Sequence, residues 1–277
     1  MPISKNLNPK NDVACKKLFS TSANADLTLE LLNHALDWHL ASPIVSLQFP
    51  TPQQLARSHG SKDSYRDVLC VDAQGQHYIV AMQVAKDEAF RLRAQYDAAK
   101  AFSGQLRKSE PYSKCSRVIL LAFADFSFFA KSTRYKANYL TLDGQTYDDE
   151  LPGMRFTFIA LTRFKKPIQG KPITALRKEE ELYLFLEEAA QLNPEALAHL
   201  VANDPIMARL QQELTQCYWS PEELAPYDSA EKRRQDELSR LTQAKERGVQ
   251  EGLQQGIALL VKKGLVSKQA ALEALKP

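Results

Sequence analysis

Two polar side chains on a predicted β-hairpin, Asp67 and Gln83, could take part in the same reaction. Ala81 lies two residues before Gln83 on the same strand. A carboxylate can ligate a divalent cation, whereas a carboxamide can orient water by hydrogen bonds but cannot act as a base. Antiparallel pairing that sets Asp67 directly opposite Ala81 puts all three on one face, with the paired Cβ atoms roughly 4.5–5.5 Å apart. That face looks like a site from which one residue is missing.

The register of this hairpin can be read from its turn. The strands 65–72 and 76–84 flank Ala73-Gln74-Gly75. A three-residue loop with glycine last suits a type I turn followed by a left-handed residue and a G1 bulge. Pairing of Asp72 with Gln76 across that loop fixes every other pair. The opposite face is apolar and is predicted to be core. It carries Val68, Cys70, Tyr78, Val80, Met82 and Val84.

Three stretches carry a resemblance to a known family. They are Asn8-Pro9-Lys10-Asn11-Asp12-Val13-Ala14-Cys15-Lys16-Lys17-Leu18-Phe19, then Asp67, then Ala81-Met82-Gln83-Val84-Ala85-Lys86. An aspartate on one strand, a short hairpin and an acidic-x-Lys or acidic-x-Gln triplet resemble the PD-(D/E)xK phosphodiesterase superfamily. More narrowly, residues from about Asn8 through Phe164 are similar to the recombination-promoting nuclease and transposase family. The resemblance implies an α/β, restriction-endonuclease-like fold with a mixed central sheet flanked by helices.

The chain departs from that family at one position, because the residue two before the glutamine is a glutamate there and Ala81 here. The resemblance implies that Asp67 and position 81 hold Mg²⁺ or Mn²⁺, with Asp12 as a third acidic partner. Asp12 fits a helix cap or a surface salt bridge equally well. Without a second carboxylate the chain should cut nucleic acid poorly or not at all. Ala81 is then either natural, as in a pseudo-nuclease, or a deliberate replacement of glutamate. A simpler interpretation is that alanine packs in a buried strand and no site existed.

Six further residues are candidates for contacts with double-stranded DNA. They are Lys16, Lys17, Arg93, Tyr96, Lys100 and Gln105. The lysine pair could approach a phosphate from the first helix. Arg93, Tyr96 and Lys100 share one helical face that could bind the DNA backbone, and Gln105 follows about a turn and a half later. Both sets also fit an ordinary solvated helix surface.

Composition sets looser bounds. A formal net charge of +3 over 277 residues is too slight to indicate nucleic-acid binding alone. The four cysteines are scattered without paired spacing, which favours reduced thiols and argues against a zinc site. No apolar stretch approaches the length of a membrane span, and the N-terminus has no hydrophobic signal core. No phosphate loop or nucleophile elbow points to an organic cofactor. We therefore expect a cytoplasmic protein without membrane contact.

The expected elements divide the chain into a nuclease-like domain, 1–164, and a helical C-terminal region, 165–277. Helices are expected at 12–19, 26–40 and 87–108, and strands at 44–49, 66–72, 76–84, 118–123, 135–142 and 154–161. Asp26 is the predicted cap of the second helix. The order of strand, hairpin, helix and strand needs a crossover connection, so the strand at 118–123 should have a parallel neighbour.

The C-terminal region is predicted to begin with a basic linker at 163–178 and to continue as helices. Gly248, Gly252 and Gly256 share one face of the last helix, where they either let two helices approach closely or weaken the helix. Apolar residues in excess of what one thin bundle buries predict a homodimer. The competing possibility is that these helices fold back onto the sheet of their own chain and leave only 230–277 loose.

Two classes of function remain open from the sequence. The first is a metal-dependent DNA endonuclease linked to recombination or mobile elements, inactive in this chain because of Ala81. The second is a natural, catalytically dead module that binds DNA or a protein partner. The residue that the unmodified gene encodes at position 81 would separate them.

Overall fold

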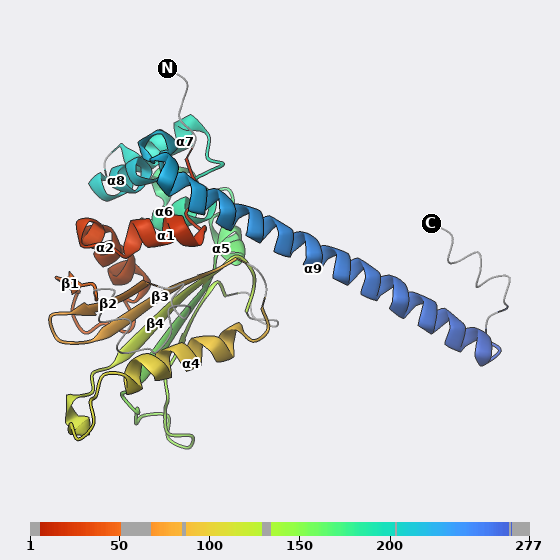
Figure 1. Cartoon of the computed structure of the whole chain (residues 1–277), viewed down its shortest axis with the longest axis horizontal. Coiled ribbons are helices and arrows are strands. Elements are labelled where there is room, and N and C mark those ends of the chain that lie inside the picture. Colours follow the sequence, from red (N-terminus) through yellow and green to blue (C-terminus); the bar gives the residue numbers. More distant parts are fainter. Residues whose placement is uncertain are drawn as a thin grey trace. The chain divides into compact units, whose positions relative to one another are not determined.

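The structure is a computed structural model that describes residues 6–50, 68–84, 87–128, 134–202, 204–265 and 267. Its strands are β1 (Leu47–Gln48), β2 (Val68–Asp72), β3 (His77–Gln83), β4 (Val118–Ala124), β5 (Lys136–Tyr139) and β6 (Met154–Ala160). In the described residues they form one mixed sheet in the order β1-β2-β3-β4-β6-β5. The fold is α/β and restriction-endonuclease-like, as predicted (Figure 1).

The hairpin between β2 and β3 has the predicted turn. The Asp72 N–H donates to the Gln76 carbonyl at 3.0 Å, and the Gly75 N–H donates to the Asp72 carbonyl at 3.0 Å. Gly75 has φ +80°, the left-handed conformation that the third loop position of such a turn requires. Val68 pairs with Val80, which is the register derived from the turn.

The strand β4 is central and parallel to both of its neighbours, β3 and β6. All of its seven residues are buried, because helices cover both faces of the sheet there. The predicted crossover and the predicted parallel neighbour are confirmed. The strand β5 closes one edge of the sheet by antiparallel pairing with β6.

Helices cover the two faces of the sheet unequally (Figure 1). The helices are α1 (Asp12–Phe19), α2 (Ala25–Ala35), α4 (Phe90–Ser103), α5 (Leu161–Ile168), α6 (Lys178–Glu188), α7 (Pro194–Val201), α8 (Pro205–Leu214) and α9 (Pro221–Lys262). The face that carries Tyr78 and Val80 forms the larger core, together with α1, α2 and α5 to α8. The other face packs against α4 alone among the described helices, through Ile79, Ala81 and a row of alanines on that helix. The site-bearing face of the hairpin is therefore the α4 face.

The helices α6 to α8 pack onto the chain's own nuclease-like core. Their apolar side chains belong to the same buried cluster as those of α1 and α2. The guanidinium of Arg209 on α8 also bonds the carboxylate of Asp26 on α2. Contacts divide the chain into one compact unit, Met1–Ala230, and a second, Glu231–Pro277, with α9 running through the boundary. The functional division at 164/165 stays a prediction.

Two local expectations differ from the structure, and a third falls outside the residues that it describes. The predicted strand at 44–49 shortens to β1, because both backbone groups of Ile44 bond the side-chain amide of Asn33, at 2.7 and 3.0 Å. Asp26 does not cap α2, since it lies inside the helix and pairs with Arg209 instead. The predicted polar loop at 51–64 lies outside the described residues.

The predicted basic linker is partly helical. The helix α5 covers its first residues because Leu161, Phe164 and Ile168 recur at helical spacing and pack into the larger core. The basic side chain of Lys165 lies on the outer side, where it pairs with Glu188 at 2.7 Å. The basic residues in this segment led to the prediction of a linker, although its apolar residues form one side of an amphipathic helix.

Candidate active site

The residues expected to form the site lie at the end of β3. Ala81 points to the α4 face, is 2% exposed and pairs with Ala122 of β4. Gln83, two residues later, is the last residue of the strand. Asp67 lies just outside the described residues, so its place opposite Ala81 stays a prediction, although the observed register of β2 and β3 leads to it.

Arg93 of α4 reaches Gln83 from the helix that covers this face. Its Nη2 donates to the Gln83 Oε1, and its Nη1 lies 3.6 Å from the Asp87 carboxylate. The guanidinium carbon also lies 4.9 Å from the centroid of the Phe90 ring. This arrangement fixes a cation beside the Gln83 amide, and a hydrogen bond from a charged donor is stronger than one between neutral groups.

Asp97 is an acidic residue of this region that sequence reasoning missed. Burial raises its pKa above the ordinary value, and the nearby charges of Arg93 and Lys100 offset part of that rise. Because α4 connects two parallel strands, it runs back along β3, and Asp97 follows Arg93 by one helical turn of about 6 Å. Ala81 precedes Gln83 by about the same distance along the strand. These matching distances lead us to expect Asp97 near the level of Ala81, and its spacing from Arg93 could have suggested the residue.

The N-terminal motif is anchored at the same end of the sheet. The Lys10 ammonium is almost buried and pairs with Asp125 at 3.1 Å and with Glu187 at 2.9 Å. The Asp125 N–H donates to the Gln83 carbonyl at 3.0 Å, so this cluster adjoins the end of β3. Lys10 belongs to the N-terminal motif of the sequence, but its two carboxylate partners were not predicted. The only signal was the position of Asp125 directly after a buried strand.

Asp12 begins α1, next to this cluster. Asn11 is the residue that caps the helix, since its side chain accepts a hydrogen bond from the Val13 N–H at 2.9 Å. The apolar side of α1 packs on the face of the sheet opposite to Ala81. Asp12 therefore comes from the other side of the sheet, and its role as a third acidic partner stays a prediction.

The candidate DNA-binding residues separate into two groups. Arg93, Tyr96 and Lys100 form a row on α4, in which Tyr96 is 65% exposed. Lys17 is engaged elsewhere, because its ammonium bonds Glu223 at 2.6 Å and lies 4.3 Å from the centroid of the Trp219 ring. Lys16 lies half-buried beside it on α1.

Gln105 does not continue the row on α4. It lies beyond the helix end, and its side chain bonds the Ser116 backbone through its amide nitrogen at 2.9 Å and its oxygen at 2.7 Å. Its observed task is to hold the segment that leads into β4. The predicted contact between Gln105 and DNA has no support from this geometry.

The described residues of the candidate site do not supply enough ligands for a metal ion while alanine occupies position 81. Within the described ranges, no three His, Cys, Asp or Glu side chains lie close enough together to hold one. Ala81 offers a methyl group where the resemblance implies a carboxylate. Over the same ranges, no helix is both long and apolar enough to cross a bilayer.

The fold combines a mixed sheet, a hairpin that carries the candidate site, a crossover helix over that site and a second helical layer. These features define a restriction-endonuclease-like protein with nuclease-like chemistry. The chain belongs to the family described as PD-(D/E)XK nuclease family transposase, whose profile matches residues 9–244. The match begins in the N-terminal motif and extends past Phe164 into α9. No curated protein and no solved structure was found to match the chain.

Proposed function

We propose that the parent form of this protein is a metal-dependent endonuclease that hydrolyses double-stranded DNA during recombination or the movement of mobile elements. The observation that carries the proposal is the pair formed by Ala81 and Gln83 at the end of β3, under a helix that presents Arg93 to it. A glutamate at position 81 would complete, with Asp67, a set of hard oxygen donors suited to Mg²⁺ or Mn²⁺. The family membership supports nuclease chemistry.

The protein's own residues would bind and orient the DNA. The row formed by Arg93, Tyr96 and Lys100 supplies two cations and an exposed aromatic ring on one side of α4. Arg93 has a second task, because it also holds the Gln83 oxygen and thereby orients the amide. Gln83 cannot take up a proton at neutral pH, so it can position water or a phosphate oxygen only by hydrogen bonds.

The test compares Ala81→Glu with the present chain on supercoiled plasmid. We expect Mg²⁺- or Mn²⁺-dependent nicking by the glutamate form, its loss on chelation, and no cleavage above background by the alanine form. Ala81→Gln is the matched control, because it adds the same bulk without a charge. Equal cleavage by the alanine and glutamate forms would show that position 81 is not a ligand position.

A second candidate is the catalytically dead binding module. The observation in its favour is that alanine fits its surroundings, since Ala81 is buried against α4 beside Ala122. A natural alanine could therefore persist without harming the fold. Failure of Ala81→Glu to cleave, together with retained binding of duplex DNA by the present chain, would favour this module.

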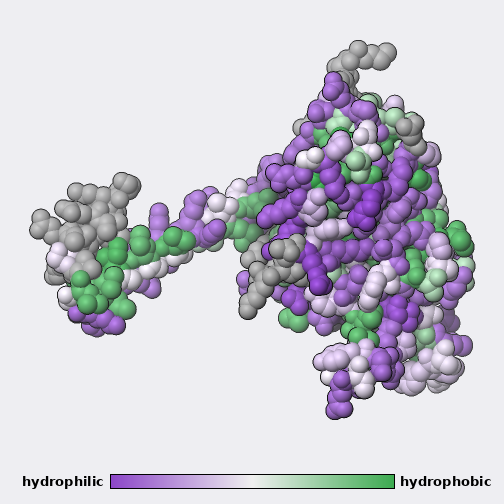
Figure 2. Space-filling view, turned by 180° about the vertical axis from the view of Figure 1, so that it is seen from behind, coloured by the Kyte–Doolittle hydropathy of each residue, from purple (hydrophilic) through white to green (hydrophobic). Residues whose placement is uncertain are grey.

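We also propose that the protein is a homodimer paired through α9. Leu238, Val249 and Leu260 are all partly exposed and recur every eleven residues, which returns to the same side of a helix after three turns. Leu253 lies beside them, and Figure 2 shows apolar side chains gathered along this helix. Two protomers would bring two single-metal sites to the two strands of a duplex.

A further inference from the structure

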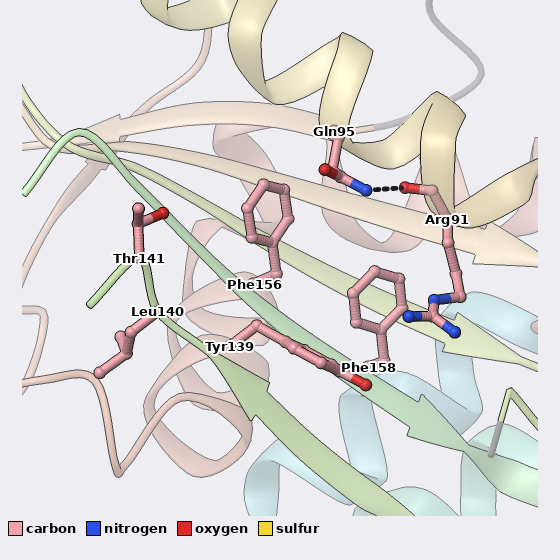
Figure 3. Close-up of a pocket in the computed structure, with 7 residues that line it drawn as sticks. All are labelled: Arg91, Gln95, Tyr139, Leu140, Thr141, Phe156 and Phe158. Carbon is pink, nitrogen blue, oxygen red and sulfur yellow. Dashed lines mark hydrogen bonds between the residues drawn. The ribbon is translucent and has the colours of Figure 1, made fainter. Parts of the chain in front are cut away.

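An aromatic pocket lies on the far side of α4 from Gln83. It is an open cavity of about 210 Å³ between α4 and the edge formed by β5 and β6. Figure 3 shows Arg91 and Gln95 projecting from the helix above Phe156 and Phe158, with Tyr139 and Thr141 on the side of β5. Pockets for drug-sized ligands are usually about 300–1,000 Å³. This cavity suits a single small ring system.

The pocket and the candidate active site share one face of the sheet. Phe158 pairs with Ala122, which in turn pairs with Ala81, so the three residues stand at one level on neighbouring strands. Two strand spacings amount to about 9–10 Å. This separation equals roughly three base steps of a DNA strand.

The chemistry of the lining matches a flat, polar-edged ring. The rings of Phe156 and Phe158 stack with centroids 6.4 Å apart, and Tyr139 meets Phe158 edge-on at 5.6 Å. The Gln95 amide nitrogen donates to the Arg91 carbonyl at 3.1 Å, which leaves the amide oxygen on the side of Phe156 (Figure 3). Phe158 is only 5% exposed and packs against the rings of Phe90 and Phe128, so the half-buried Phe156 offers the ring for stacking with a base. The Gln95 amide oxygen can accept a hydrogen bond from a base edge.

Arg91 adds a cation at the rim of this pocket. Its guanidinium is exposed on the first turn of α4, and Arg93, two residues later, faces the candidate active site. One helical turn thus presents a cation to each side of the helix. A DNA backbone that crosses this turn would meet both guanidinium groups.

We propose that this pocket binds one unpaired or flipped-out nucleobase of the DNA, a few nucleotides from the phosphate to be cleaved. The proposal rests on the proposed function, because it assumes a DNA substrate at Gln83. A base inside a duplex cannot reach rings that lie beside a helix, so the pocket would favour DNA with an unpaired base. Binding would therefore distinguish damaged, mismatched or branched DNA from a regular duplex.

The experiment measures binding to three labelled duplexes by fluorescence anisotropy at 100 mM KCl, with the chain as it stands. One duplex is fully paired, one carries a single unpaired thymine, and one carries an abasic residue in its place. Stacking of one base predicts about 5- to 100-fold tighter binding of the unpaired thymine than of the abasic residue. Gln95→Trp, which would fill the cavity, should abolish that preference and leave affinity for the paired duplex unchanged.

Two further variants keep the result interpretable. Leu92→Trp adds the same ring to the exposed side of α4, outside the pocket lining, and should keep the preference. Phe156→Leu removes a ring face and should reduce the preference. Equal binding of the thymine and abasic duplexes, or a preference that survives Gln95→Trp, would overturn the pocket proposal while DNA binding stands. No binding to any of the three duplexes would instead overturn the proposed DNA function itself.

Discussion

Introducing a glutamate at Ala81 should make the protein's stability depend on metal. The new carboxylate replaces a side chain that is 2% exposed, pairs with Ala122 and belongs to the cluster that packs under α4. Burial of a polar group without a partner and added bulk in a packed region each cost about 1–3 kcal/mol. Arg93, which bonds the side chain of Gln83 two residues further along β3, should offset part of this cost. We expect a net loss of about 2–4 kcal/mol, or roughly 5–15 °C in Tm.

A bound divalent cation should reverse most of that loss. At a concentration of one hundred times Kd, a ligand that binds only the folded state contributes about 2.7 kcal/mol. Differential scanning calorimetry with EDTA, Mg²⁺ and Mn²⁺ measures the response. The chain as it stands and Ala81→Gln serve as controls, and neither should respond to the metal. A glutamate form that melts at one temperature in all three solutions would refute the placement of a metal ligand at position 81.

Three other perturbations have defined outcomes. Asp97→Asn should stabilise the protein at pH 7, because burial raises the pKa of Asp97 and disfavours its charged form in the folded state. The gain in stability should vanish as the pH falls below the ordinary pKa of 3.8. Melting curves recorded over a series of pH values measure this dependence. The same variant of the glutamate form should lose DNA affinity or cleavage if Asp97 acts in the site. Tyr78→Phe removes the hydroxyl that donates to the buried Asp72 carboxylate at 2.8 Å, and urea unfolding should show a loss of about 1.5–3 kcal/mol. Leu253→Lys should convert the proposed dimer to a monomer in light scattering, whereas a monomeric parent protein would remove α9 pairing from the mechanism.

The hairpin was predictable because its determinants are local. The turn Ala73-Gln74-Gly75 fixes the register through a single left-handed glycine, and alternation along the strands then assigns each face. The strand β4 was equally clear, because an unbroken apolar run of this length is typical of a strand covered on both sides. These features need no knowledge of distant parts of the chain.

The partners of Lys10 were not predictable, because they depend on contacts across the whole fold. Its two carboxylates, Asp125 and Glu187, come from the end of a strand and from a helix of the C-terminal region. The helix α5 was not predicted for a related reason. Its apolar side can be recognised only from the core against which it packs. Periodicity identifies an element, but tertiary packing decides which charges it brings together.

The anchoring of the N-terminal motif has a consequence for the time at which the site forms. Lys10 can pair with Glu187 only after that residue has been synthesised. The Asn8 N–H likewise donates to the hydroxyl of the later residue Tyr227, at 2.8 Å. A ribosome adds about 5–20 residues per second, so the partner of Asn8 is made roughly 10–40 s after the motif itself. The hairpin can therefore form on the ribosome well before the edge of the site beside it. A nascent chain should therefore hold β3 in an incomplete setting until synthesis has passed Tyr227, which delays completion of the candidate active site to that point.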